Sequence, residues 1–230
     1  MSAPSRWPAI WNAFRIAAAA LIAAAIVAQA SRTIGGAVSG GRDVALTTVN
    51  FFSFFTVLSN VSSVVVLLIA GIRGLVKARQ PEPYWLSVAL ACVSTYMVVT
   101  GLVYNLLLRG VALPQGTTVP WSNEVLHVVG PVFLLVDLFV NVARRLPWRT
   151  IVAILTFPVV WILYTLVRGP LVTNPVTKDP WWYPYPFLDP HLTGGYGGVA
   201  LYVVGIAVAL GAVAALVGAV GRRRAGVEPA

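Results

Sequence analysis

The chain has 230 residues, of which 58% are hydrophobic and only 10% are charged. A soluble domain carries about 25% charged residues, so the composition excludes an ordinary soluble fold and predicts an integral membrane protein. The net charge of +9 comes from basic residues at the ends of apolar runs. This placement indicates topology signals and contacts with anionic lipids, and it argues against nucleic-acid binding.

Six apolar runs are long enough to cross the hydrocarbon core of a bilayer, which requires about 20 residues. The first run also has features of a secretory signal, with small residues before Ser31. Trp7, Trp11 and Phe14 lengthen it beyond a typical signal core, which favours a retained helix. We therefore expect an all-α integral membrane protein: a single domain over residues 1–230, with six transmembrane helices in one bundle, near residues 9–30, 50–72, 85–108, 125–143, 150–168 and 196–220.

The basic residues also predict the orientation of the chain in a cell membrane. Five lie on one side of the predicted spans: Arg32, Arg42, Arg109, Arg168 and Lys178. Ten lie on the other: Arg6, Arg73, Lys77, Arg79, Arg144, Arg145, Arg149, Arg222, Arg223 and Arg224. Because basic loops stay in the cytoplasm, this asymmetry places both termini there.

Small polar side chains form a stripe in the second apolar run. They lie three or four positions apart and therefore share one face of a helix: Ser53, Thr56, Asn60 and Ser63. Lipid cannot satisfy hydroxyl and amide groups, so this face should point into the bundle or a polar cavity. The third and fourth runs bring further polar groups to the outer half of the bundle, namely Tyr104, Asn105 and His127.

These groups could form a catalytic site. A threonine hydroxyl needs a base to become a nucleophile, and histidine is the usual base, so Thr56 and His127 are the candidates. Attack on an ester also needs donors for the developing oxyanion, which Asn60, Tyr104 or Asn105 could supply. Glu124 lies three residues before His127 and is expected to orient the imidazole. The spacing permits this catalytic arrangement without requiring it, and the residue pattern alone favours packing and interhelical hydrogen bonds as the role of Thr56 and His127.

Two charges inside the inner half of the predicted spans suggest a different function. Arg15 and Asp137 lie at similar depth, and a lone charge in hydrocarbon is costly. We therefore expect a buried ion pair between two helices. The pair is either structural or part of a proton-coupled path, and in the second case the chain is a non-catalytic lipid- or solute-binding protein or a transporter. No metal or other cofactor is expected, because two histidines and the single Cys92 form no zinc-binding pattern.

The loop before the sixth run is rich in aromatic residues and proline. Trp181, Trp182, Tyr183 and Tyr185 alternate with prolines that exclude a helix. Such rings suit the membrane interface. The loop is therefore predicted to be an interfacial belt or a lid over an outer cavity, and the two roles are compatible.

Several short segments carry a resemblance to a known family. Residues 54–60 (FFTVLSN) and 123–127 (NEVLH), followed by Pro131, resemble the androgen-induced and androgen-dependent TFPI-regulating proteins, and more closely a bacterial six-span branch of that group. The resemblance extends from Ala9 to Gly221. It implies a membrane-embedded threonine hydrolase of fatty acyl esters, with Thr56 as nucleophile and His127 as the second essential residue. Membrane lipids and an acyl ester substrate would then be the partners, while the oligomeric state stays open.

Overall fold

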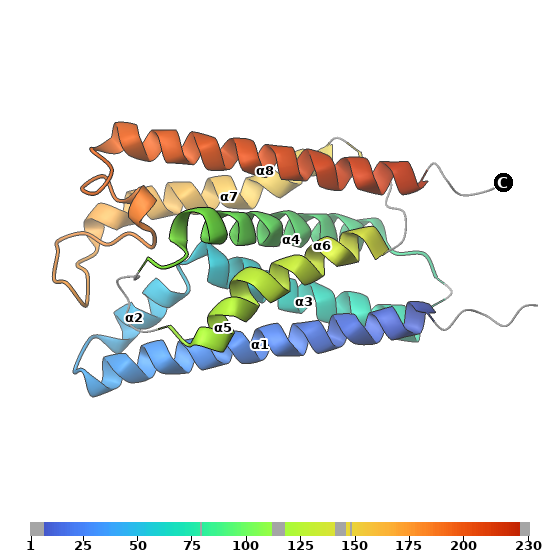
Figure 1. Ribbon diagram of the computed structural model, residues 1–230, viewed down its shortest axis with the longest axis horizontal. Helices are drawn as coiled ribbons and strands as arrows, with labels where there is room; N and C mark the ends of the chain where they lie inside the picture. The colour runs from blue at the N-terminus through green and yellow to red at the C-terminus, as the bar shows by residue number, and fades with distance from the viewer. Residues whose placement is uncertain (1–6, 79, 112–117, 141–145, 148, 226–230) are drawn as a thin grey trace, which may run out of the picture.

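The computed structural model describes residues 7–78, 80–111, 118–140, 146–147 and 149–225. Within these ranges the chain forms an elongated helical bundle in which six helices are long and apolar enough to span a membrane (Figure 1). The prediction of an all-α bundle with six spans is confirmed. The spans consist of α1 (Trp7–Ser39), α3 (Phe55–Val76), α4 (Tyr84–Val103) with η1 (Tyr104–Leu108), the run of α5 (Pro120–Glu124), η2 (Val125–Val129) and α6 (Gly130–Val140), α7 (Arg149–Arg168) with η3 (Gly169–Leu171), and α8 (Tyr196–Ala225).

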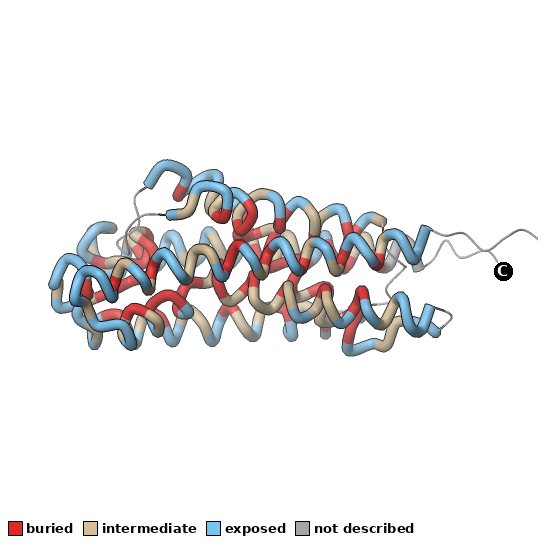
Figure 2. The backbone as a smooth tube through the Cα atoms, turned by 90° about the horizontal axis from the view of Figure 1, so that it is seen from below, coloured by how far each residue is buried: buried red, intermediate tan, exposed pale blue. Residues whose placement is uncertain are grey.

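Buried residues line the faces along which the helices meet (Figure 2). The helix α4 is the most enclosed and contacts α3, α6, α7 and α8. By contrast, α8 is mostly exposed and presents large apolar side chains such as Leu201 and Val208 outward. Lipid tails are as apolar as these side chains. The exposed surface therefore fits a multi-pass membrane protein.

The first, second and fourth spans differ from their predicted bounds. The fourth begins at Pro120 rather than near residue 125, and its predicted end at 141–143 lies outside the described residues. The helix α1 continues to Ser39 rather than ending near residue 30, because Thr33 and Ala37 are buried where α1 packs against α2 (Val44–Phe51) and α5. The second span begins at Phe55 rather than near residue 50, because the chain first forms α2 and then bends. Thr56 consequently lies in the first turn of α3, where backbone N–H groups lack helical partners, and not deeper inside the span.

Two short π-helical segments interrupt the spans near the same end of the bundle. They are η1, which continues α4, and η2, which joins α5 to α6. Such segments frequently occur at functional sites, because they shift the direction of side chains relative to a regular helix. Tyr104 is the first residue of η1, and His127 lies in the middle of η2. The irregular backbone therefore positions two of the predicted site residues.

The helices α1 and α3 approach closely at Gly71. A Cβ atom on Gly71 would lie 2.7 Å from Cγ1 of Ile16 and 2.9 Å from the carbonyl oxygen of Asn12, so a side chain there forces the helices apart. We expect Gly71→Ala to lower the free energy of unfolding by about 1–3 kcal/mol, measured by denaturant unfolding in detergent. The control is Gly205→Ala in α8, where no atom lies within 4 Å of the added carbon. Equal effects of the two substitutions would contradict this packing argument.

Candidate functional site

The hydroxyl and the backbone N–H of Thr56 both form hydrogen bonds with a tyrosine from a distant loop. The phenol oxygen of Tyr185 lies 3.1 Å from the backbone nitrogen of Thr56 and 3.1 Å from its Oγ1 atom. Phe54, the residue before α3, provides no side-chain cap. The phenol oxygen accepts from the Thr56 N–H and thus takes the place of a helix cap. Both side chains are largely buried, so Tyr185 holds the hydroxyl and the start of α3 together.

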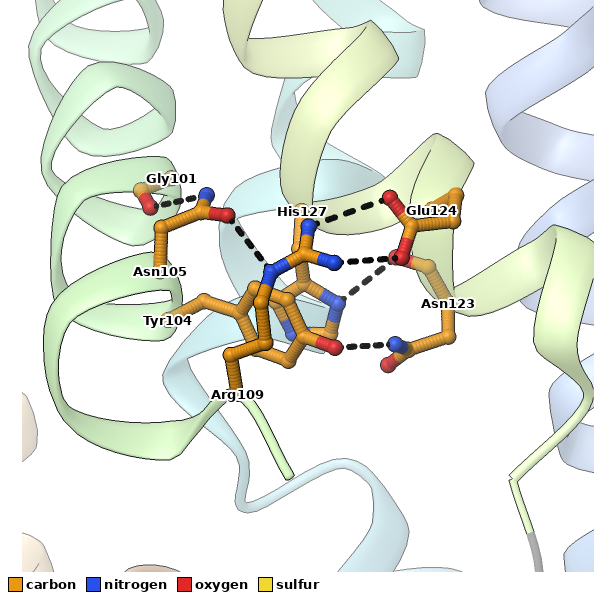
Figure 3. A network of polar contacts seen from close by, with 7 residues as sticks. All are labelled: Gly101, Tyr104, Asn105, Arg109, Asn123, Glu124 and His127. Atoms are coloured by element: carbon orange, nitrogen blue, oxygen red, sulfur yellow. Dashed lines mark hydrogen bonds and ion pairs between the residues drawn. The ribbon is translucent and has the colours of Figure 1, made fainter. Parts of the chain in front are cut away.

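His127 is held in one tautomer by the backbone. Its Nδ1 atom lies 2.9 Å from the carbonyl oxygen of Asn123. Because a carbonyl only accepts, Nδ1 carries the proton and Nε2 keeps its lone pair. The imidazole stacks on the ring of Tyr104 with centroids 4.0 Å apart, and the Tyr104 hydroxyl accepts from the side-chain amide of Asn123 (Figure 3). The ring is therefore fixed in position, with one nitrogen able to act as a base.

The prediction that Glu124 orients the imidazole is wrong. Both carboxylate oxygens of Glu124 accept from the guanidinium of Arg109, at 3.2 Å each, and not from His127 (Figure 3). A spacing of three residues brings side chains together on an α-helix, but η2 begins at the next residue and its i→i+5 bonds widen the turn. Asn123, one residue earlier, takes the predicted role through its backbone carbonyl.

The two asparagines predicted as oxyanion donors are committed elsewhere. The amide of Asn60 donates to the carbonyl oxygens of Thr56 (2.8 Å) and Leu126 (3.2 Å) and so ties α3 to η2. Asn105 is exposed, donates to the carbonyl of Gly101 and accepts from Arg109 (Figure 3). Of the predicted donors, only Tyr104 faces the cavity described next.

Thr56 and His127 line the same cavity. Its volume is about 340 Å³, and it lies between α1, α3, η1, η2 and the loop that carries Tyr185. A second cavity of about 170 Å³ lies between α3, α4, α7 and α8, and its walls are almost entirely apolar. The residues common to both walls are Thr56, Tyr104, Leu108 and Tyr185. Among the described residues no hydrogen bond joins Thr56 to His127, so the two groups face one space without touching.

Tyr185 is the functional candidate that the residue patterns did not single out. It lies 129 residues after Thr56, and only the prediction of a lid over the cavity pointed to its loop. Burial raises the pKa of its phenol, and hydrogen bonds with Thr56 oppose that change only partly. The phenol therefore keeps its proton at neutral pH and can donate a hydrogen bond into the cavity wall.

Arg15 and Asp137 form a buried ion pair at a distance from this cavity. The Nε atom of Arg15 lies 2.7 Å from Oδ1 of Asp137, and Nη2 lies 3.1 Å from Oδ2. The indole of Trp11 also donates to Asp137, and Asn12 accepts from Arg15. Neither charge lines either cavity at Thr56. This satisfied network fits a structural role for the pair.

Within the described ranges, no group of three or more histidine, cysteine, aspartate or glutamate side chains is placed to hold a metal ion. Comparison with known proteins adds nothing to the geometry: no family model, no curated protein and no solved structure matches this chain.

Proposed function

We propose that this chain is an intramembrane hydrolase of fatty acyl esters, with Thr56 as nucleophile and His127 as general base. The observation that carries the proposal is the position of Thr56 on the wall shared by two cavities, one of which also contains His127. The resemblance of the segments around both residues to threonine hydrolases agrees with it. The excess of basic residues in the terminal segments and in the sequence loops on their side of the predicted spans supports a cell-membrane location with cytoplasmic termini.

The reaction has two steps. Oγ1 of Thr56 attacks the carbonyl carbon of the ester, and its proton passes to Nε2 of His127. The tetrahedral intermediate collapses when the ester C–O bond breaks and His127 returns the proton to the leaving alcohol. Water then attacks the acyl-threonine with His127 again as base, which releases the fatty acid and restores the hydroxyl.

The two cavities separate the two parts of such a substrate. The apolar cavity, lined by residues such as Val99, Leu155 and Leu210, suits an acyl chain, for which each buried methylene contributes about 0.8 kcal/mol. The cavity that contains His127 has polar groups from Gln29, Thr33 and Asn123 on its wall. It suits the alcohol part and the water of the second step. The ester carbonyl would then lie beside Thr56, where the cavities meet.

The proposal requires a change in the hydrogen bonding of Thr56 when substrate binds. Its hydroxyl bonds to Tyr185 in this structure, so its proton must reach His127 either after rotation of the Thr56 side chain or through one water. The ester oxygen would then take the place of Oγ1 at the phenol of Tyr185. The Tyr185 hydroxyl would then be the donor that stabilises the oxyanion, because the backbone N–H of Thr56 already donates to the phenol oxygen.

The proposal is tested by incubating the purified, detergent-solubilised chain with a panel of fatty acyl esters and measuring the released fatty acid. The panel varies the acyl length and the alcohol separately, because each part occupies its own cavity. We expect turnover of at least one long-chain ester. A folded wild-type protein that hydrolyses none of them would overturn the proposal and favour non-catalytic lipid binding.

Tyr185→Phe tests the assignment of the Tyr185 hydroxyl as the oxyanion donor. This substitution removes only the hydroxyl and keeps the ring that packs against Phe54 and Phe187. Loss of one oxyanion donor lowers kcat by about 10²–10³-fold, and we expect a decrease of this size with little change in KM. Tyr183→Phe is the matched control, since its hydroxyl bonds to Tyr196 outside the site. A normal kcat in Tyr185→Phe would show that Tyr185 only caps α3.

A further inference from the structure

Arg168, at the end of α7, is a cation whose contacts among the described residues are with an amide and aromatic rings. Its Nη2 atom donates to Oδ1 of Asn50 at 2.7 Å. The guanidinium carbon lies 5.2 Å from the centre of the Trp182 ring and 5.9 Å from that of Tyr164. Within the described part of the chain, no acidic side chain forms an ion pair with Arg168. Among the described residues, an amide oxygen and two aromatic faces are therefore the groups that offset its positive charge.

Three N–H donors around this guanidinium have no acceptor among the described residues. They are Nη1 of Arg168, Nδ2 of Asn50 and Nε1 of Trp182, and all three atoms are buried. Asn50 is fully buried and Trp182 is 2% exposed. More than nine in ten buried polar groups have a hydrogen-bond partner, so three adjacent unsatisfied donors indicate a place where an acceptor binds.

The kind of acceptor follows from the chemistry of the cluster. Every free group is a donor and the one full charge is positive, so the ligand must be an anion with oxygen acceptors. A water molecule would bring two further hydrogens toward aromatic rings and would leave the charge uncompensated. A phosphate group carries several acceptor oxygens and can accept from donors on three residues at once.

We propose that Asn50, Arg168 and Trp182 form a phosphate-binding site, which takes the phosphate of a phospholipid headgroup or free phosphate. Arg168 is only half-buried, so the cluster reaches the surface of the bundle along this side chain. The site is separate from the catalytic one, because none of its three residues lines the cavities at Thr56. Its validity does not depend on the proposed hydrolase activity.

The test is thermal unfolding of the detergent-solubilised full chain in sodium phosphate and in sodium chloride at equal ionic strength. A ligand that binds only the folded state raises the melting temperature, and we expect phosphate to do so in the wild type. Arg168→Gln should abolish the rise. Trp182→Phe keeps an aromatic ring beside Arg168 and removes the indole N–H donor, so it should reduce the rise even if Arg168→Gln fails to fold. Lys178→Gln, an exposed cation of the same loop, should respond like the wild type.

A second comparison identifies the source of the phosphate. The same proteins are heated in mixed micelles that contain either phosphatidylglycerol or a galactolipid without phosphate. Stabilisation by inorganic phosphate supports a site for the free anion, whereas stabilisation by phosphatidylglycerol alone, lost in both variants, supports a headgroup site. No stabilisation by either, or equal stabilisation in wild type and variants, would overturn the proposal.

Discussion

Thr56→Ala is expected to abolish hydrolysis of fatty acyl esters by this chain, with kcat at least about 10⁴-fold lower, as for other nucleophile deletions. His127→Ala should lower kcat by about 10²–10⁴-fold, because it removes the general base and acid of both steps. Both are small truncations at the wall of a cavity, so the bundle should keep its fold. The measurement is release of fatty acid from the best ester of the panel, with unfolding in detergent recorded for each variant.

Two controls make this result specific for the Thr56 hydroxyl. Thr33→Ala removes a hydroxyl from the wall of the cavity proposed to hold the alcohol part but not the nucleophile, so it should raise KM and leave kcat largely intact. Thr56→Ser retains a hydroxyl and should hydrolyse measurably. Turnover in Thr56→Ala near the wild-type rate would contradict the mechanism, and equal loss in Thr33→Ala would point to a general effect on the cavity.

The prediction of the fold succeeded where it depends on a single property of the sequence, the length of its apolar runs. Six apolar runs at bilayer length have no alternative to helices, because a spanning segment must satisfy its own backbone, and the described residues form six helices that are long and apolar enough to span a membrane. Helix ends were less well predicted at α1, at α3 and at the start of the fourth span in α5. There the bounds depend on packing of α1 against α2 and α5, which no local pattern reveals.

The candidate site was predicted in part, and the errors share a cause. Thr56 and His127 face one cavity because each lies on the polar face of its own segment. The predicted partner of His127 was wrong, because α-helical spacing was assumed for Glu124 although the π-helical turn of η2 intervenes. The partner of Asn60 was also mistaken, because its side-chain amide donates to the backbone carbonyls that packing brings near. Tyr185 comes from a loop without regular structure, so periodicity gave no indication of its contact with Thr56.

The second large effect concerns stability. Asp137→Ala should lower the free energy of unfolding by about 3–5 kcal/mol, because removing one partner of a buried pair leaves the charge of Arg15 uncompensated. Asp137 is fully buried and Arg15 is 3% exposed, so water cannot replace the lost carboxylate. Denaturant unfolding in detergent measures the change. Glu124→Gln is the matched control: it breaks the pair with Arg109, in which both side chains are 48% exposed, and should cost at most about 1 kcal/mol.

The double replacement Arg15→Leu with Asp137→Leu separates a structural role of this pair from a functional one. Exchange of a buried ion pair for apolar side chains is often neutral or stabilising, so the double variant should recover most of the stability that Asp137→Ala loses. Since neither charge lines the cavities at Thr56, it should also hydrolyse esters at the wild-type rate. A stable double variant without activity would mean that the pair takes part in function, which is what the proton-coupled interpretation requires.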